Sequence, residues 1–248
     1  MKPSKKVSKS QEMKIYGKRA AEVLFEQRPD DIIRAYVTKD GLFTFKRIVK
    51  YCADKKLAYH VVEAEEIESI AKSNHHEGVV LLVKTKKLPV LTEMFSQKGR
   101  SLILALEEVE NPHNLGAILR SAAHFGVTGI VYLAKVPVAQ TSAAYRTAEG
   151  GAESVSALHI QDWKEVQELS KKNGYKVMTT SSHGGNSLFK TKFPEKTLLF
   201  LGAEGAGLSE KLLNLGDKIQ IPGSGQVESL NVSNACVSIL TEWYRQGL

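Results

Sequence analysis

Short apolar runs alternate with segments of helical periodicity from residue 101 to the end of the chain. The runs have the length of single strands, and strands with few polar residues are typical of a sheet that is covered on both faces. Alternation of strands and helices predicts a mainly parallel sheet with helices on both sides, which is an α/β fold. We predict strands at 102–106, 129–133, 155–160, 175–180, 197–201 and 218–221, and helices at 114–125, 162–173, 209–214 and 231–245.

A smaller alternating unit precedes this region. The charged, proline-containing stretch at 84–89 interrupts the pattern and marks a linker between the two units. Within the smaller unit we predict a helix around 20–24, strands at 32–37, 59–62 and 79–83, and helices at 43–53 and 65–71. We therefore divide the chain into a disordered basic tail at 1–12, a small α/β domain at 13–84, a linker at 85–100 with a short helix, and a larger α/β domain at 101–248.

The positive charge of the chain is concentrated in its N-terminal part. Residues 1–100 contain 21 Lys and Arg against 13 Asp and Glu, whereas residues 101–248 contain 13 against 14. Such asymmetry predicts a polyanion-binding portion, suited to RNA, joined to a near-neutral catalytic portion. Charge alone leaves open the alternative that the basic domain is merely soluble.

Composition argues against several classes of protein. No apolar run approaches the about 20 residues that cross a membrane, and the Lys-rich N-terminus lacks the apolar segment of a secretory signal. Cys52 and Cys236 have no metal-ligand spacing and are too few for a disulfide framework. We expect them to be buried thiols in a reducing cytosol, which places the protein in the cytoplasm. His75 and His76 lack a third ligand at a suitable spacing, so we expect no metal site.

Three polar segments that contain glycine or begin a predicted helix point to a ligand site. They are Asn-Pro-His-Asn-Leu-Gly-Ala-Ile-Leu-Arg at 111–120, Gly-Ala-Glu-Gly-Ala-Gly-Leu at 202–208 and Ser-Leu-Asn-Val-Ser at 229–233. Glycine lets the backbone approach a ligand closely, because it has no Cβ. The second segment has neither the Rossmann fingerprint nor the Gly-Lys-Ser/Thr of a P-loop, so an adenosine held by backbone groups fits it better.

In this order, the three segments closely resemble the motifs of the SpoU/TrmH family of RNA ribose 2′-O-methyltransferases, within the SPOUT superfamily. The resemblance covers about the whole chain beyond the tail. It implies a trefoil knot in the C-terminal domain, S-adenosyl-L-methionine as cofactor, and a homodimer with active sites near the dimer interface. It also implies that residues 13–84 bind the substrate, which is ribosomal RNA or transfer RNA; the separate basic domain favours ribosomal RNA.

The resemblance also implies functions for single residues. Arg120 matches the catalytic arginine, and a guanidinium can stabilise an oxyanion and bind a phosphate through two parallel hydrogen bonds. Whether Arg120 also accepts the ribose proton is left open, because arginine holds its proton to a pKa above ~12. The implied catalytic residues are Arg120, Asn111, Glu204 and Ser229, the cofactor-binding residues are Gly202, Ile221, Leu230 and Asn231, and the RNA contacts are Asn114 and Arg146.

Several of these residues also have a purely structural interpretation. Asn114 stands near a predicted helix start, where its side chain can cap free backbone N–H groups, and Ser229 or Asn231 can do the same for the last helix. Arg146 can pair with Glu149 three residues further along a helix instead of contacting RNA.

Glu77 departs from the family pattern, because the family often has glutamine at this position of His-His-Glu-Gly. Two other classes of protein compete with the methyltransferase. An RNA-binding or ribosome-assembly factor that has lost catalysis is disfavoured by the intact catalytic set. A nicotinamide-dependent oxidoreductase is disfavoured because no early Gly-x-Gly-x-x-Gly is present.

Overall fold

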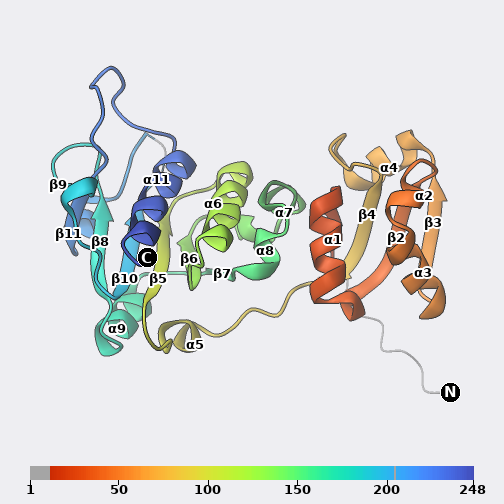
Figure 1. The fold of residues 1–248 in the computed structure, drawn as a ribbon, viewed down its shortest axis with the longest axis horizontal. Helices are drawn as coiled ribbons and strands as arrows, with labels where there is room; N and C mark the ends of the chain where they lie inside the picture. The colour runs from red at the N-terminus through yellow and green to blue at the C-terminus, as the bar shows by residue number, and fades with distance from the viewer. Residues whose placement is uncertain (1–11, 204) are drawn as a thin grey trace.

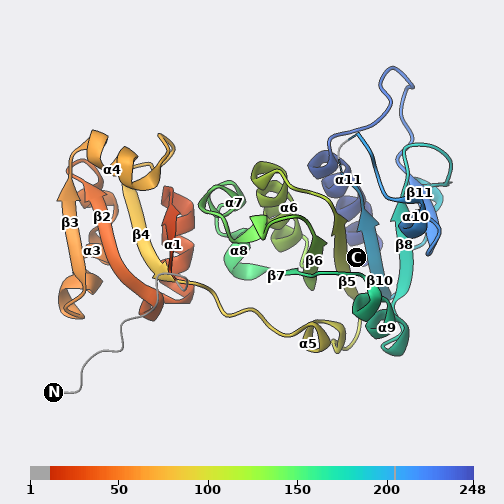
Figure 2. The same ribbon diagram turned by 180° about the vertical axis from the view of Figure 1, so that it is seen from behind.

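The computed structural model describes residues 12–203 and 205–248. These residues form two α/β units, each built on its own sheet, that lie side by side and are joined by an extended segment (Figure 1). The view from behind shows the same separation, with helix α1 of the first unit facing α7 and α8 of the second (Figure 2).

The N-terminal sheet has the strand order β1-β4-β2-β3. Strand β4 (Val79–Lys84) is antiparallel to β1 (Glu12–Tyr16) and to β2 (Ile32–Thr38), and β3 (Ala58–Val62) is parallel to β2. Its helices are α1 (Lys18–Gln27), the 3₁₀ turn η2 (Pro29–Asp31), α2 (Gly41–Thr44), α3 (Lys46–Asp54) and α4 (Ala64–Ala71).

The structure differs from the sequence prediction at two places in this unit. Glu12, which we assigned to the tail, is the first residue of β1, and the rest of the tail lies outside the described residues. The helix predicted at 43–53 is two helices, because Phe45 leaves the helical conformation at φ −101° and ψ 19°. Its ring is buried in the core, which explains why an apolar periodicity continues across the break.

The C-terminal sheet has the strand order β7-β6-β5-β10-β8-β11-β9, and every neighbouring pair is parallel. The predicted α/β fold with a mainly parallel sheet is therefore confirmed. The knot implied by the resemblance stays a prediction. The strands are β5 (Ser101–Glu107), β6 (Gly129–Leu133), β7 (Ala157–His159), β8 (Lys176–Thr180), β9 (Asn186–Ser187), β10 (Lys196–Leu201) and β11 (Asp217–Gln220).

Most helices of this unit begin and end within a few residues of their predicted limits. Besides two 3₁₀ turns, three elements were not predicted: α7 (Ser142–Ala148), α8 (Gly151–Ser154) and the two-residue strand β9. They are short, and the small residues of α7 and α8 give no clear apolar period. The remaining elements are α5 (Leu91–Phe95), α6 (Pro112–His124), η3 (Val138–Gln140), α9 (Lys164–Lys172), η4 (Leu188–Lys190), α10 (Glu210–Leu213) and α11 (Val232–Arg245).

The central strands bury side chains on both faces of the sheet. Successive residues of a strand point to opposite faces, so the wholly apolar β5 contributes to two separate cores. Leu102, Leu104 and Leu106 belong to the cluster that includes residues of α6 and α11. Ile103 and Ala105 belong to the cluster on the other face, with residues of α5 and α9.

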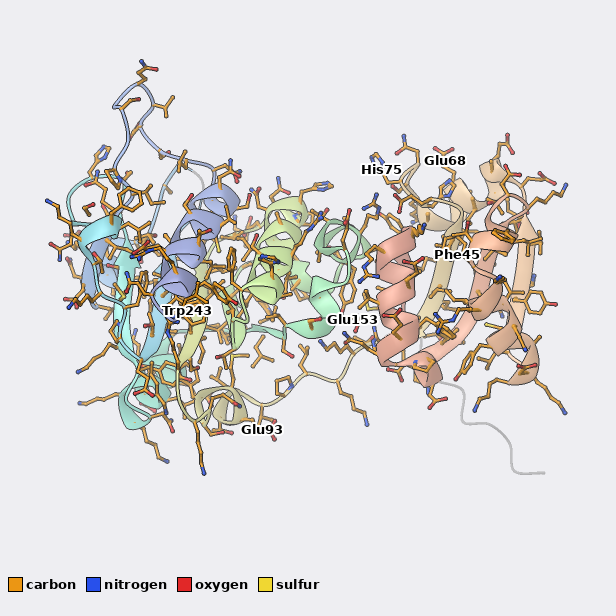
Figure 3. The ribbon with its side chains drawn as sticks, viewed as in Figure 1. Phe45, Glu68, His75, Glu93, Glu153 and Trp243 are labelled. Carbon is orange, nitrogen blue, oxygen red and sulfur yellow. The ribbon has the colours of Figure 1, made fainter. Side chains whose placement is uncertain are left out.

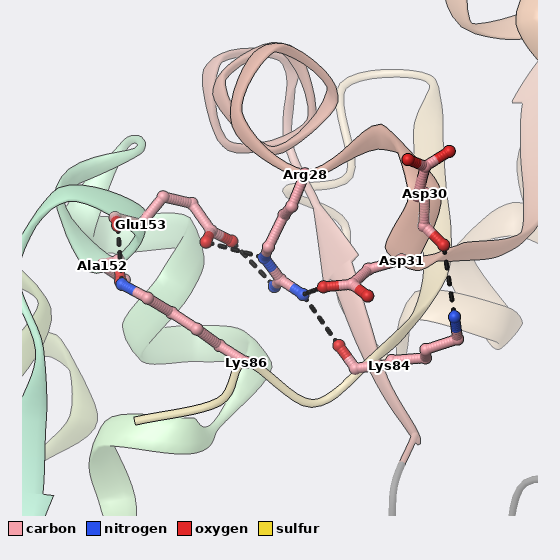
Figure 4. A network of polar contacts seen from close by, with 7 residues as sticks. All are labelled: Arg28, Asp30, Asp31, Lys84, Lys86, Ala152 and Glu153. Carbon is pink, nitrogen blue, oxygen red and sulfur yellow. Dashed lines mark hydrogen bonds and ion pairs between the residues drawn. The ribbon is translucent and has the colours of Figure 1, made fainter. Parts of the chain in front are cut away.

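A buried ion pair holds the two units together (Figure 4). The Arg28 guanidinium donates from Nε and Nη2 to the two carboxylate oxygens of Glu153, at 2.8 and 2.9 Å, and the Glu153 side chain is only 1% exposed. Lys86 of the linker donates to the backbone oxygens of Ala152 and Glu153. Burial lowers the pKa of Arg28, but the hydrogen bonds and charge of Glu153 outweigh it, so the pKa is raised overall.

Among the described residues, no helix is long and apolar enough to cross a membrane. In the same part of the chain, no cluster of three or more His, Cys, Asp or Glu side chains is arranged to hold a metal ion.

Candidate active site

A cavity lies where three neighbouring strands end. Strands β8, β10 and β11 are parallel, so their carboxyl ends meet at one edge of the sheet, the usual ligand position in α/β folds. The segments that follow them, together with the beginning of α11, enclose about 590 Å³. This volume suits a small-molecule ligand. Apolar residues of the wall are Leu201, Leu208, Ile219, Ile221, Leu230, Val232 and Ile239, and polar residues include Thr180, Ser181, Ser182 and Ser229.

The second motif forms the tight loop after β10. The Gly207 N–H donates to the Ala203 oxygen at 3.0 Å, and the loop folds back onto Gly202. A Cβ at Gly202 would lie 2.1 Å from the Gly207 carbonyl carbon, so only glycine fits. Gly205 and Gly207 have φ of 82° and 68°, in the left-handed region that favours glycine. Glu204, which we expected to be catalytic, lies outside the described residues.

The third motif begins helix α11 at the rim of the cavity. Ser229 and Leu230 line the cavity, and Leu230 keeps 47% of its surface exposed. Asn231 is the N-cap of α11, because its Oδ1 accepts hydrogen bonds from the Ser233 backbone N–H at 2.9 Å and from the Ser233 hydroxyl at 2.6 Å. Asn231 itself adjoins the lining residues without being one of them.

The first motif begins helix α6 at Asn111 rather than at Asn114. The Asn111 Oδ1 accepts a hydrogen bond from the His113 N–H at 2.8 Å, and Pro112 takes the first helical position. The expected cap at Asn114 is therefore wrong, because Asn114 lies within the first turn. Its Oδ1 instead accepts a hydrogen bond from the Asn231 Nδ2 at 3.1 Å, which joins the first motif to the third.

Arg120 and Arg146 lie away from the cavity lining. Arg120 follows Asn114 by six residues on α6, which is a rise of about 9 Å along the helix axis. Its side chain is 60% exposed and pairs with Glu149 at 3.2 Å. Arg146 on α7 pairs with Glu149 at 3.4 Å, as the sequence spacing allowed, and with Glu77 of the N-terminal unit at 3.0 Å.

Glu107 is a structural support of the site that the sequence analysis missed. It is the last residue of β5, and its carboxylate accepts hydrogen bonds from the Ser209 N–H at 2.7 Å and the Ser209 hydroxyl at 2.8 Å. These contacts hold the end of the second motif against the strand that leads to the first. An acidic residue directly after the apolar run 102–106 was the signal available in the sequence.

Both cysteines are buried and free, as expected. Burial raises the pKa of the Cys236 thiol on α11 to about 12, so the thiol is neutral at ordinary pH. Cys236 therefore has a packing role beneath the first turns of α11, close to the cavity.

Comparison with known proteins agrees with this geometry. Residues 101–241 match the SpoU rRNA Methylase family, and residues 14–89 match the RNA 2′-O ribose methyltransferase substrate binding domain. A protein of Escherichia coli O157:H7 named "Uncharacterized tRNA/rRNA methyltransferase YfiF" is 39% identical over 241 residues, which span 96% of this chain and 70% of that protein. The 23S rRNA (guanosine-2′-O-)-methyltransferase RlmB of Vibrio parahaemolyticus is 28% identical and covers 94% of this chain and 97% of its own length.

The fold is also that of a solved methyltransferase. The SpoU methyltransferase AviRb from Streptomyces viridochromogenes, in complex with AdoMet, superimposes with a TM-score of 0.81 at 22% identity, over 97% of this chain and 92% of that one. The family match spans the strands, the cavity and the three motifs. The chain therefore belongs to the SpoU rRNA methylase family.

Proposed function

We propose that this protein transfers a methyl group from S-adenosyl-L-methionine to a ribose 2′-hydroxyl of ribosomal RNA. The observation that carries the proposal is the cavity at the ends of β8, β10 and β11, which the second and third motifs line. The cavity has the position of ligand sites in α/β folds, and the residues that line it lie within the segment 101–241 that matches a methyltransferase family.

The cavity fits the proposed cofactor chemically. S-adenosyl-L-methionine supplies a methyl group already activated on a sulfonium, so the protein mainly has to position the reactants. Ile221 and Leu230 provide apolar surface for an adenine ring, and the glycine-rich backbone around Gly202 brings amide groups close to a ligand. Asn231 fixes the start of α11, which carries the rim of the cavity.

Arg120 acts on the RNA rather than on the cofactor. Its exposed guanidinium can bind an RNA phosphate and stabilise the negative charge that develops on the 2′-oxygen. Ser229 lies in the cavity wall. Asn111 caps α6, and the hydrogen bond between Asn114 and Asn231 holds the first turn of α6 next to the start of α11. We keep Glu204 as a further candidate on the basis of its place in the second motif.

The N-terminal unit, with the basic excess, binds the RNA. Lysines and arginines neutralise phosphates and supply much of the affinity for nucleic acid. Relatives are named both for ribosomal and for transfer RNA, and the RlmB name favours the ribosomal substrate. We further propose that the protein works as a homodimer in the cytoplasm, with Asn114 close to the bound RNA.

The test uses the purified full-length protein with labelled S-adenosyl-L-methionine and RNA from cells that lack the protein. The expected result is label in a 2′-O-methylated nucleotide of ribosomal RNA, and no transfer by Arg120→Ala although its cofactor affinity, measured by calorimetry, stays within a few-fold. Label on a base would contradict the reaction. Label in transfer RNA alone would support the transfer RNA alternative, and cofactor binding without transfer would support a silent RNA-binding factor.

A further inference from the structure

The carboxylate of Glu149 bridges Arg120 and the interface between the two units. The Oε2 of Glu149 lies 3.2 Å from Nη2 of Arg120, and its Oε1 lies 3.4 Å from Nη1 of Arg146. Glu149 is the residue that ends α7, and Arg120 belongs to α6, so the bridge joins two helices of the C-terminal unit. Neither the motifs nor the cavity includes Glu149.

The N-terminal unit holds the other side of this bridge. Arg146 donates from Nη2 to Glu77 at 3.0 Å and from Nε to the His75 backbone oxygen at 3.1 Å. The second oxygen of Glu77 accepts a hydrogen bond from the Lys18 N–H, at the beginning of α1, at 2.6 Å. Figure 3 shows His75 at the end of the N-terminal unit that faces the C-terminal one. The departure of Glu77 from the family's glutamine thus supplies a charged partner for Arg146.

The backbone turn that begins at Glu149 packs closely against both units. Glu149 itself has φ 45°, which is unusual for a residue other than glycine. A Cβ at the following residue, Gly150, would lie 2.6 Å from the Val23 side chain of α1. A Cβ at Gly151 would lie 2.8 Å from the Arg120 Cα. The turn therefore touches the RNA-binding unit on one side and the helix that carries Arg120 on the other.

We propose that Glu149 is a positioning residue for Arg120. Arg146 and Glu77 in turn hold the Glu149 side chain, so its position depends on how the N-terminal unit packs against the C-terminal unit. This inference rests on the proposed function. A long, 60% exposed arginine side chain samples many rotamers, and an ion pair at Nη2 restricts them. A guanidinium has five N–H donors, so this pair is compatible with a second contact to a phosphate or ribose oxygen.

The same contact would instead slow methyl transfer if the ion pair with Glu149 kept Arg120 from binding RNA. The geometry favours positioning, because Glu149 meets the guanidinium at Nη2 and the exposed group has further N–H donors for a phosphate. The two effects predict opposite changes in rate when the Glu149 charge is removed.

The experiment compares four full-length variants with the wild type: Glu149→Gln, Glu77→Gln, the double variant, and Glu22→Gln as control. Glu22 pairs with Arg19 on the surface of α1, so its variant also loses the charge of an exposed ion pair. Each protein is assayed for single-turnover methyl transfer to RNA from cells that lack the protein, for RNA KM, for S-adenosyl-L-methionine affinity by calorimetry, and for thermal melting.

We expect Glu149→Gln to lower the rate of methyl transfer about tenfold, because a less well positioned Arg120 is less often in the productive geometry. Its melting temperature and cofactor affinity stay at the wild-type values. Glu77→Gln lowers the rate less, and adds little in the Glu149→Gln background, because both act through one network. Glu22→Gln changes none of these quantities.

Three results would overturn the inference. One is a wild-type rate in Glu149→Gln, and another is a faster rate, which would mean that Glu149 restrains Arg120. The third is a lower rate accompanied by an equal loss of cofactor affinity or folding, which would reveal a merely structural role. If the wild type transferred no methyl group, the proposed function would fail, and this inference with it.

Discussion

At the scale of single residues, the proposed reaction depends on the placement of Arg120. The helix that carries it begins with a well-formed cap at Asn111, and its exposed guanidinium pairs with Glu149. Arginine suits this position because its planar group can bind two oxygens at once, whereas lysine presents a single point of charge.

We therefore predict that Arg120→Lys loses at least about a hundredfold in the rate of methyl transfer, in the range typical for loss of a group that stabilises a developing oxyanion. Affinity for S-adenosyl-L-methionine should not change, because Arg120 lies outside the cavity lining. Single-turnover kinetics and calorimetry measure the two quantities. A lysine variant with near wild-type rate would show that a point charge suffices.

Single residues were predicted from the sequence with uneven success. Asn231 as a helix cap and the Arg146–Glu149 pair are confirmed, because local spacing determines both. The cap at Asn114 is wrong, since one motif contains two asparagines and Pro112 moves the helix start back to Asn111. The contact of Glu107 with Ser209 and the contact of Glu149 with Arg120 join residues far apart in the sequence, so they depend on tertiary packing that spacing does not determine.

At the scale of elements, the loop after β10 shows how the chain makes a ligand site. The strand brings the backbone to the edge of the sheet, and Gly202 lets the loop close directly over it. A Cβ at Gly202 would collide with the backbone of residues 207–208, so the conformation of the loop itself requires glycine at this position.

Gly202→Ala should thus distort the loop and weaken S-adenosyl-L-methionine binding by tenfold or more, about 1.4 kcal/mol. The global fold should persist, because β10 remains buried between β5 and β8. Calorimetry measures the affinity, and circular dichroism with thermal melting checks the fold. Gly223→Ala is a matched control, since a Cβ there meets no atom within 4 Å. Equal affinities for both variants would contradict this account of Gly202.

Helix α11 contains a pH-dependent contact at its C-terminal end. Glu242 accepts hydrogen bonds from Arg245 at 2.7 and 2.8 Å and from Gln246 at 2.8 Å, and these contacts lower its pKa from 4.5 to about 2. A carboxylate with a lower pKa in the folded state stabilises that state above its unfolded pKa.

The contribution of Glu242 to stability should accordingly be complete above about pH 5 and should be lost as the pH falls from 4.5 toward 2. Glu242→Gln should remove this part of the acid dependence. Urea titrations at a series of pH values measure it in both proteins. A stability difference between them that stayed constant down to pH 2 would rule out this assignment.

The larger elements were predictable because the parallel strands are almost wholly apolar and alternate with periodic helices. Elements with few residues were not, as β9 and α8 show. The break at Phe45 escaped prediction because its ring continues the apolar face of the adjoining helix. The backbone conformation changes at Phe45, whereas the apolar pattern of the sequence does not.

At the scale of the whole molecule, a basic unit and a near-neutral unit are joined through a partly buried interface with both apolar and polar contacts. In the pair between Arg28 and Glu153 the Glu153 side chain is only 1% exposed, and Gly150 packs against Val23. The division of charge was evident in the sequence, whereas the contacts across the interface follow only from the fold.

Glu153→Ala should destabilise the protein by up to about 3 kcal/mol, because it removes the buried carboxylate that pairs with Arg28 and leaves the guanidinium only Asp31, at 3.1 Å, as a counter-ion. The loss should be smaller for Glu153→Gln, which keeps hydrogen-bond acceptance. Glu22→Ala, which breaks a partly exposed pair on α1 of the N-terminal unit, should cost less than about 1 kcal/mol. Urea denaturation provides the comparison. Equal losses for Glu153→Ala and Glu22→Ala would mean that the interface adds nothing to stability.

The most direct test of the central claim is to map ribose methylation in the ribosomal RNA of cells with and without this protein. We predict that deletion removes a 2′-O-methyl group from ribosomal RNA, that the wild-type gene restores it, and that Arg120→Ala does not. An unchanged map of 2′-O-methylation, in ribosomal and transfer RNA alike, would contradict the claim that this protein is an RNA ribose methyltransferase.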